Sequence, residues 1–176
     1  LNNKPLYQRL VLDQGFYPDG IWTAPTDKAL KNDIILSMKA GFNGARLHEK
    51  VFEDRFHYWA DKLGYITWAE WGNWGANENA KGTETAFMHE WPKIVEHLKN
   101  HPSIITWTPF NETNTLECNA QHKKLMRLAY DVTKKIDPTR PVNETSGYQH
   151  QKTDIWTVHH YAVSYTHLTL PTTPYV

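Results

Sequence analysis

The sequence has one cysteine, no net charge and no long apolar run, and each absence excludes a class of protein. With Cys118 as the only cysteine in 176 residues, neither an intrachain disulfide nor an all-thiolate metal site can form. Basic and acidic residues both number 19, which gives a formal net charge of zero. Such a balance provides no electrostatic footprint for nucleic acid, and no apolar stretch has membrane-spanning length. We therefore expect neither nucleic acid nor a membrane as a partner.

Start and targeting signals are missing as well. The chain begins at Leu1 rather than methionine, in what reads as the approach to a strand. We interpret it as part of a longer reading frame, so the missing signal peptide does not assign a compartment. Localisation and oligomeric state stay unknown.

Two catalytic signatures are also absent. No Gly-x-Ser-x-Gly elbow occurs, so a serine hydrolase triad of the α/β-hydrolase type has no support. Residues 12–17 are bulky and aromatic where a nucleotide-binding fold would carry a glycine-rich phosphate loop. His89, His97 and His101 fall in or beside one predicted helix and are interpreted as surface or capping residues. No metal and no cofactor is predicted.

Short apolar runs alternate with amphipathic helical stretches along the chain. Strands are predicted at 7–12, 42–47, 65–69 and 103–110, from 142 onward, and at 154–161. Helices are predicted between Thr26 and Gly41, from Phe52 to Gly64, from Phe87 to His101-Pro102, and from Leu125 to Asp137-Pro138.

This alternation predicts an α/β fold with a parallel sheet and crossover helices, either a doubly wound sheet or a (β/α)₈ barrel. Polar residues follow several predicted strands, and in a barrel they would all surround one mouth. We predict a partial (β/α)₈ TIM barrel with about strands one to six and without the last strands.

The run that ends in Asn111-Glu112 is the most informative stretch. Ile104, Ile105 and Trp107 form an apolar strand, and an amide and a carboxylic acid follow where it should end. A carboxyl group at the mouth of an apolar pocket can keep its proton near neutral pH, as general-acid catalysis requires. Glu112 is therefore the candidate catalytic acid.

Eight tryptophans are many for this length. We assign about half of them to the core, because tryptophan buries a large area. Trp71 and Trp74 lie among glycine and asparagine just past a predicted strand, and both are candidate platforms for stacking on a sugar.

The C-terminal residues differ from the rest of the chain. Residues 163–176 have neither a helical stripe nor strand alternation and resemble a translated sequencing adapter. We interpret residues 1–162 as a partial barrel domain, which the resemblance described next makes a glycosidase domain, and residues 163–176 as a non-native tail.

Several ordered pieces of the sequence resemble glycoside hydrolase family 2, which includes β-galactosidases, β-glucuronidases and β-mannosidases. They are residues 1–6, 41–46, 100–107, Asn111-Glu112 and 137–142. The resemblance runs from Leu1 to about Ala162. It implies a catalytic TIM barrel and a retaining mechanism with two carboxylates, in which Glu112 is the acid/base. The family nucleophile is a glutamate at the end of strand seven, which would lie beyond Tyr161, so no carboxylate of this chain is assigned to that role.

The resemblance also implies substrate-binding residues, and each has a simpler alternative. Asn111 would bind the sugar 2-hydroxyl, or else cap a helix. Arg46 would support the nucleophile, or else form a structural ion pair. His48 lies one position earlier than the family histidine and is either a substrate contact or a surface residue. Tyr161 resembles a family tyrosine near the nucleophile.

Three further residues complete the predicted substrate-binding set. They are Glu70, Trp71 and His160. Some family members hold a divalent metal near the position of Glu70, but the histidine that accompanies it there is absent here. Glu70 is therefore interpreted as a polar contact or ion-pair partner.

The predicted function is that of a fragment of a retaining glycoside hydrolase acting on terminal β-linked sugars, with a carbohydrate as its partner and no activity of its own. Another retaining glycanase with Asn-Glu after strand four, or a sugar-binding barrel without catalysis, are the alternatives.

Overall fold

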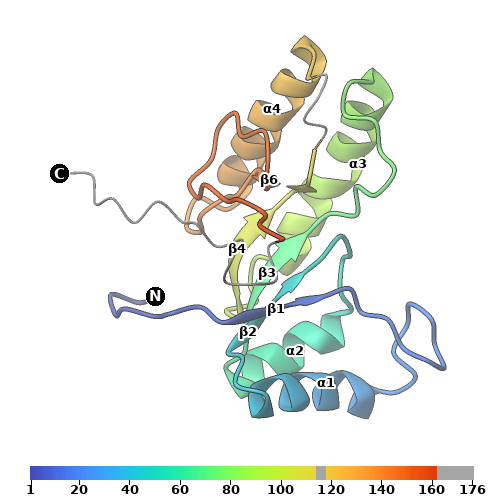
Figure 1. Cartoon of the computed structure of the whole chain (residues 1–176), viewed down its shortest axis with the longest axis vertical. Helices are drawn as coiled ribbons and strands as arrows, with labels where there is room; N and C mark the ends of the chain where they lie inside the picture. The colour runs from blue at the N-terminus through green and yellow to red at the C-terminus, as the bar shows by residue number, and fades with distance from the viewer. Residues whose placement is uncertain (114–117, 162–176) are drawn as a thin grey trace.

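The computed structural model describes residues 1–113 and 118–161 as a parallel α/β arrangement (Figure 1). The strands are β1 (Leu10–Asp13), β2 (Gly44–Leu47), β3 (Ile66–Glu70), β4 (Ile104–Thr108), β5 (Phe110–Asn111) and β6 (Thr145–Ser146). The helices are α1 (Asp27–Lys39), α2 (Asp54–Leu63), α3 (Lys81–Leu98) and α4 (Ala120–Ile136).

The main sheet has the strand order β1-β2-β3-β4, and every neighbouring pair is parallel. Because the order never reverses, the sheet has no switch point of the kind that defines a doubly wound fold. Successive right-handed crossovers then place their helices on the same face of the sheet. In Figure 1, α1 and α2 lie together at one end of the sheet, and α3 and α4 at the other.

One predicted strand is divided in two. Pro109 separates β4 from β5, because proline has no N–H to donate to a ladder. Beyond it, β5 pairs in parallel with β6, and Trp107 forms a parallel bridge with Val142. The segment that begins at Val142 therefore continues the sheet beside β4.

Local signals in the sequence set the helix ends. The hydroxyl of Thr26 accepts a hydrogen bond from the Ala29 N–H at 3.1 Å, which caps α1 as predicted. Gly64 follows α2 with a φ of 69°, a left-handed conformation that glycine adopts without cost. The side chain of Asn119 caps α4 by accepting from the His122 N–H.

The core lies between the sheet and the helices in two clusters. In one, Phe87 and Trp91 of α3 pack with Trp107 of β4. In the other, Leu30 of α1 and Phe56 of α2 pack with other buried residues that include Ala45 and Leu47 of β2. Side chains alternate across a strand, so Arg46, between Ala45 and Leu47, points to the opposite face of the sheet.

The prediction of a strand at 154–161 was wrong. This segment has no ladder partner in the described chain, and individual hydrogen bonds fix it instead. The Asp154 N–H donates to the Val142 carbonyl, and the Thr157 hydroxyl accepts from the Gly147 N–H at 2.8 Å. The segment thus lies beside β6 without joining the sheet. Residues 163–176 lie outside the described residues.

No described helix combines the length and the apolar character needed to span a bilayer.

Candidate functional site

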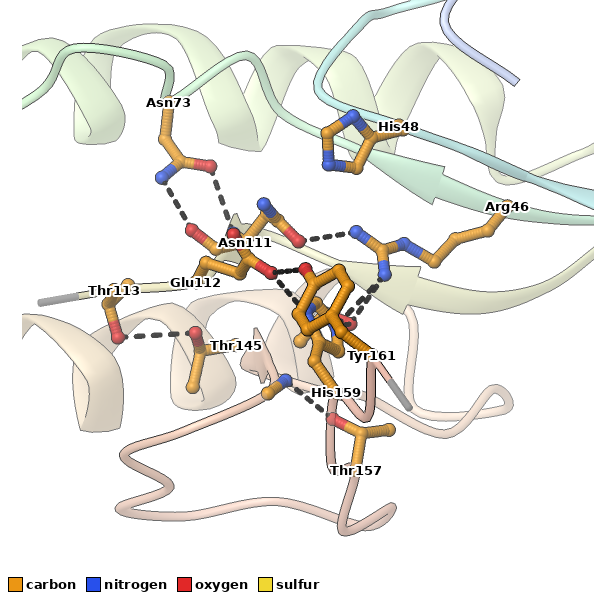
Figure 2. A network of polar contacts seen from close by, with 12 residues as sticks. Arg46, His48, Asn73, Asn111, Glu112, Thr113, Thr145, Thr157, His159 and Tyr161 are labelled. Atoms are coloured by element: carbon orange, nitrogen blue, oxygen red, sulfur yellow. Dashed lines mark hydrogen bonds and ion pairs between the residues drawn. The ribbon is translucent and has the colours of Figure 1, made fainter. Parts of the chain in front are cut away.

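Polar side chains from separate strands meet at the carboxyl end of the sheet (Figure 2). Arg46 comes from β2, Glu70 from the end of β3, and Asn111 from β5. Glu112 follows β5 directly, and His159 approaches from the segment after β6. Parallel strands end at one edge of a sheet, so residues far apart in the sequence share one site.

The backbone of Glu112 has an uncommon conformation. Its φ of 44° lies in the left-handed region, which few residues other than glycine adopt. The Glu112 N–H donates to the Ser146 carbonyl at 2.9 Å and ties this turn to β6. Such strain persists where surrounding contacts enforce it, and it is concentrated at functional sites.

The Glu112 carboxylate accepts two hydrogen bonds, and both fall on the same oxygen. The Tyr161 hydroxyl donates to Oε1 at 2.5 Å, and His159 Nδ1 contacts Oε1 as well. Partial burial raises the pKa of Glu112, but the hydrogen bonds from Tyr161 and His159 outweigh burial, so the pKa lies below its ordinary value. The expectation that an apolar pocket keeps this acid protonated was therefore wrong for the protein without substrate.

Asn111 is held from both sides. Its backbone N–H donates to Asn73 Oδ1 at 2.9 Å, and Asn73 Nδ2 donates to its carbonyl at 3.0 Å. Its side-chain Oδ1 accepts from Arg46. The helix-capping alternative for Asn111 was wrong, because Asn119 caps α4. Binding of a sugar hydroxyl by Asn111 stays a prediction.

Arg46 organises the site from β2. Its guanidinium forms an ion pair with Glu70 and donates to Asn111 and to the Ser146 hydroxyl. The prediction that Glu70 is an ion-pair partner is confirmed. Glu70 Oε2 also accepts from the Glu49 N–H at 2.9 Å. Full burial raises the pKa of Glu70 to about 7, although Arg46 opposes this shift.

His48 and Glu49 follow β2 and lie beside the acid. His48 is only 8% exposed, so its interpretation as a surface residue was wrong. Its Nδ1 lies 2.9 Å from Gln14 Nε2. Burial, and then Arg46, lower the pKa of His48, while burial raises the pKa of Glu49. Contact between His48 and substrate remains a prediction.

The two candidate stacking tryptophans have opposite environments. Trp71 is 6% exposed, packs on Phe87 and Phe110, and donates its indole N–H to Glu90. Its ring has no open face, which removes the basis for its predicted role as a sugar platform. Trp74 is 83% exposed. It is the member of the pair whose ring is accessible from the site.

His159 rather than His160 contacts the acid. His160 is exposed and only lines the hollow beside Glu112. Thr157, His159 and Tyr161 are at alternate positions, and all three side chains hydrogen-bond toward the site or β6. In an extended segment, alternate residues point the same way. Tyr161 was already a candidate site residue, and this alternation places His159, not His160, on the same side as Tyr161. The alternation is therefore the signal that would have indicated His159.

Two hollows meet at Glu112. One, of about 400 Å³, is lined by Glu49, Asn73, Trp74 and Glu78 as well as by Asn111 and Glu112. The other, of about 460 Å³, lies on the side of Arg46, His159 and Tyr161. Glu112 thus borders both hollows, so a substrate in either one could come within hydrogen-bond reach of its carboxylate.

In the described ranges, no group of three or more histidine, cysteine, aspartate or glutamate side chains is placed to hold a metal ion. The donors at the site are amides, a guanidinium, a hydroxyl and imidazoles, which suit the hydroxyl groups of an organic substrate.

Comparison with known proteins agrees with this geometry. The family model described as "Glycosyl hydrolases family 2, TIM barrel domain" matches residues 24–174. The chain belongs to glycosyl hydrolase family 2. The predicted partial TIM barrel is confirmed by this match and by the structural neighbours. The match extends past residue 161, so the interpretation of 163–176 as a non-native tail stays a prediction.

Relatives within the family carry two activities in their names. A β-galactosidase from Photobacterium profundum is 29% identical over 168 residues, which cover 88% of this chain and 15% of the relative. A β-glucuronidase from Bacteroides fragilis is 31% identical over 126 residues, 66% of this chain and 17% of the relative. The chain thus spans about 15% of the length of the first of these relatives.

Solved structures support the same fold. The β-glucuronidase of Parabacteroides merdae, with glycerol in its active site, superimposes with a TM-score of 0.71 at 20% identity. The superposition covers 80% of this chain and 18% of that chain.

Proposed function

We propose that this chain forms the acid/base side of the active site of a retaining β-glycosidase that removes terminal β-linked sugars. The observation that carries the proposal is Glu112, fixed after β5 in a strained turn, hydrogen-bonded by His159 and Tyr161 and open to a hollow on either side. Family membership supports the class of reaction.

In the first step Glu112 would protonate the glycosidic oxygen, and in the second it would deprotonate water. The lowered pKa of Glu112 suits the second step, in which the carboxylate must be ionised. The first step needs a protonated acid. A second carboxylate about 5–5.5 Å away, as retaining enzymes have, would raise the pKa of Glu112 by charge repulsion.

We propose that this second carboxylate, the nucleophile, is not among the described residues. Glu70 is paired with Arg46 and fully buried, and Glu49 and Glu78 are buried as well. The chain alone should then fail to hydrolyse glycosides, because a retaining mechanism cannot proceed without a nucleophile.

The test uses aryl β-galactosides and β-glucuronides with the 176-residue chain and with a longer protein that contains it. We expect no turnover by the chain and turnover by the longer protein. In the longer protein, Glu112→Gln should lower kcat by about 10²–10⁴-fold. With a dinitrophenyl leaving group, which departs without acid assistance, azide should restore turnover, because azide attacks the glycosyl-enzyme without a base. Glu96→Gln, an exposed change on α3, is the matched control.

Turnover by the 176-residue chain would contradict the placement of the nucleophile. Full activity of Glu112→Gln in the longer protein would contradict the acid/base assignment. Sugar binding by a longer protein that hydrolyses none of these substrates would instead favour the non-catalytic barrel.

A further inference from the structure

The imidazole of His159 bridges the acid and the arginine at the centre of the site (Figure 2). Its Nδ1 contacts Glu112 Oε1. On the other side of the ring, Nε2 lies 2.9 Å from the Ser146 hydroxyl and 3.2 Å from Arg46 NH1. The side chain is 15% exposed, so water competes little for these contacts.

The fold leaves a space shaped for this ring. Gly147, after β6, has a φ of 78°, and a Cβ added there would lie 3.0 Å from both Cγ and Cδ2 of His159. The Tyr148 ring packs on the imidazole with centroids 5.9 Å apart. The Gly147 N–H donates to the Thr157 hydroxyl, which joins the turn to the segment that carries His159. The ring is thus held in one orientation.

The neighbours of Nε2 determine where the imidazole proton lies. A guanidinium only donates hydrogen bonds, so Nε2 must offer its lone pair to Arg46. The Ser146 hydroxyl accepts from Arg46 at 2.8 Å and is then free to donate to Nε2. A proton on Nε2 would have to be accepted by the Ser146 hydroxyl at 2.9 Å, and it would leave the Arg46 N–H at 3.2 Å without the ring lone pair. The form in which both Arg46 and Ser146 can donate to Nε2 is the one with the ring proton on Nδ1 alone.

A histidine N–H at Oε1 also decides which oxygen of Glu112 can carry a proton. A protonated carboxyl group has one hydroxyl oxygen and one carbonyl oxygen, and the carbonyl oxygen accepts from a donor. Oε1 accepts hydrogen bonds from both His159 and Tyr161. Because the carbonyl oxygen is the stronger acceptor, the two donors at Oε1 favour a proton on Oε2, where the described chain places no hydrogen bond.

We propose that His159 is a positioning residue for the acid/base: Arg46 fixes its ring in the Nδ1–H form, and this N–H directs the transferable proton to Oε2 of Glu112. The glycosidic oxygen would meet Oε2, while Oε1 stays anchored. The series Glu70, Arg46, His159, Glu112 then links a fully buried carboxylate to the reacting one.

This inference rests on the proposed function for its meaning, but its test needs neither substrate nor turnover. The 176-residue chain is labelled with ¹⁵N-histidine, and the ring nitrogens of His159 are assigned by comparison with His159→Asn. At pH 7 we expect a protonated Nδ1 and an unprotonated Nε2. A proton on Nε2 would overturn the proposal, whether or not the longer protein hydrolyses glycosides.

A second measurement follows the Glu112 carboxyl carbon by ¹³C NMR as the pH is changed. His159→Phe removes the donor, so the pKa of Glu112 should rise toward its ordinary value. His159→Asn keeps an N–H donor near the place of Nδ1 and should restore most of the wild-type titration. His89→Asn, a change at an exposed histidine of α3, should leave the titration unchanged. Equal titration of Glu112 in the wild type and His159→Phe would overturn the proposal, and the wild-type tautomer decides it if a variant does not fold.

Discussion

Arg46 and Glu70 form an ion pair between neighbouring strands, with side chains that are 13% and 0% exposed. The pair differs from a surface salt bridge, because both groups have lost most of their hydration. Burial raises the pKa of Glu70 from its ordinary value of 4.5 to about 7. Between these two pH values, the folded chain binds a proton at Glu70 that the unfolded chain has largely lost. The contribution of Glu70 to stability is therefore largest at low pH and declines as the pH rises.

Arg46→Met should destabilise the chain by about 3–5 kcal/mol at pH 8, because it leaves a buried carboxylate without its partner. At pH 4 the loss should be smaller, since Glu70 is then protonated in the folded chain and mostly protonated in the unfolded chain. Urea unfolding at the two pH values measures this difference, and Arg46→Lys, which keeps the charge, should lose less. A loss independent of pH would show that packing rather than charge causes the effect.

His57 should make the fold sensitive to acid. It is 0% exposed, and neither ring nitrogen has a hydrogen-bond partner within the described ranges. Burial, and then the neighbouring His101, lower its pKa from 6.5 to about 4. A depressed histidine pKa means that stability is complete above pH 6.5 and is lost as the pH falls toward 4, by about 3 kcal/mol.

His57→Phe should flatten the dependence of the unfolding free energy on pH between 6.5 and 4. His89→Gln, which changes an exposed histidine of α3, is the control and should leave the curve as it is. An unchanged slope in His57→Phe would mean that another group takes up the proton.

Arg140 should be a major stabilising residue although it lies far from the acid. Its guanidinium donates to the carbonyls of Lys99, His101 and Ile104, and to Asp137. Arg140→Ala should lower the free energy of unfolding by about 2–4 kcal/mol, because these partly buried acceptors lose a charged donor. Chemical denaturation measures the loss, and Arg127→Ala on the exposed side of α4 should cost little. A similar loss in both variants would contradict this role.

The sequence predicted the elements better than the precise contacts of the site. Apolar periodicity and the signals at Thr26, Gly64 and Pro138 located the helices, because these are local properties of the chain. The position of Glu112 followed from the end of an apolar strand and from the family resemblance. The environment of a side chain depends on residues distant in sequence, which is why the lowered pKa of Glu112 was not foreseen.

The histidine of the site shows the same limit. His159 and His160 are identical in type, and only the direction in which each side chain points distinguishes them. The predicted strand at 154–161 implied an alternation that would have placed His159 on the side of Tyr161. The sequence does not show which residues lie opposite this segment, and Arg46 is one of them. The alternation alone therefore did not indicate that His159 contacts Glu112.

Gly147→Ala should disturb the acid through His159. A φ of 78° costs an alanine about 1–2 kcal/mol, and its Cβ would press on the imidazole ring at 3.0 Å. The pKa of Glu112, followed by ¹³C NMR, should move toward its ordinary value as the ring is displaced. Gly41→Ala shares a positive φ but meets nothing within 4 Å, so it should lower stability without changing the Glu112 titration. Equal titrations in the two variants would contradict the proposed support of the ring.

Substitution of Trp71 should lower stability, whereas substitution of Trp74 should weaken substrate binding. Trp71→Ala empties a core position between Phe87 and Phe110 and should destabilise the chain by about 3–5 kcal/mol. Trp74→Ala removes a ring that is 83% exposed at the hollow beside Glu112, so the free energy of unfolding should stay within about 0.5 kcal/mol of wild type. In the longer, active protein the same change should raise KM about 3- to 10-fold, since an aromatic stacking contact is worth roughly 0.5–1.5 kcal/mol. Thermal unfolding and steady-state kinetics measure the two effects, and an unchanged KM for Trp74→Ala would show that the sugar occupies the other hollow, beside Tyr161.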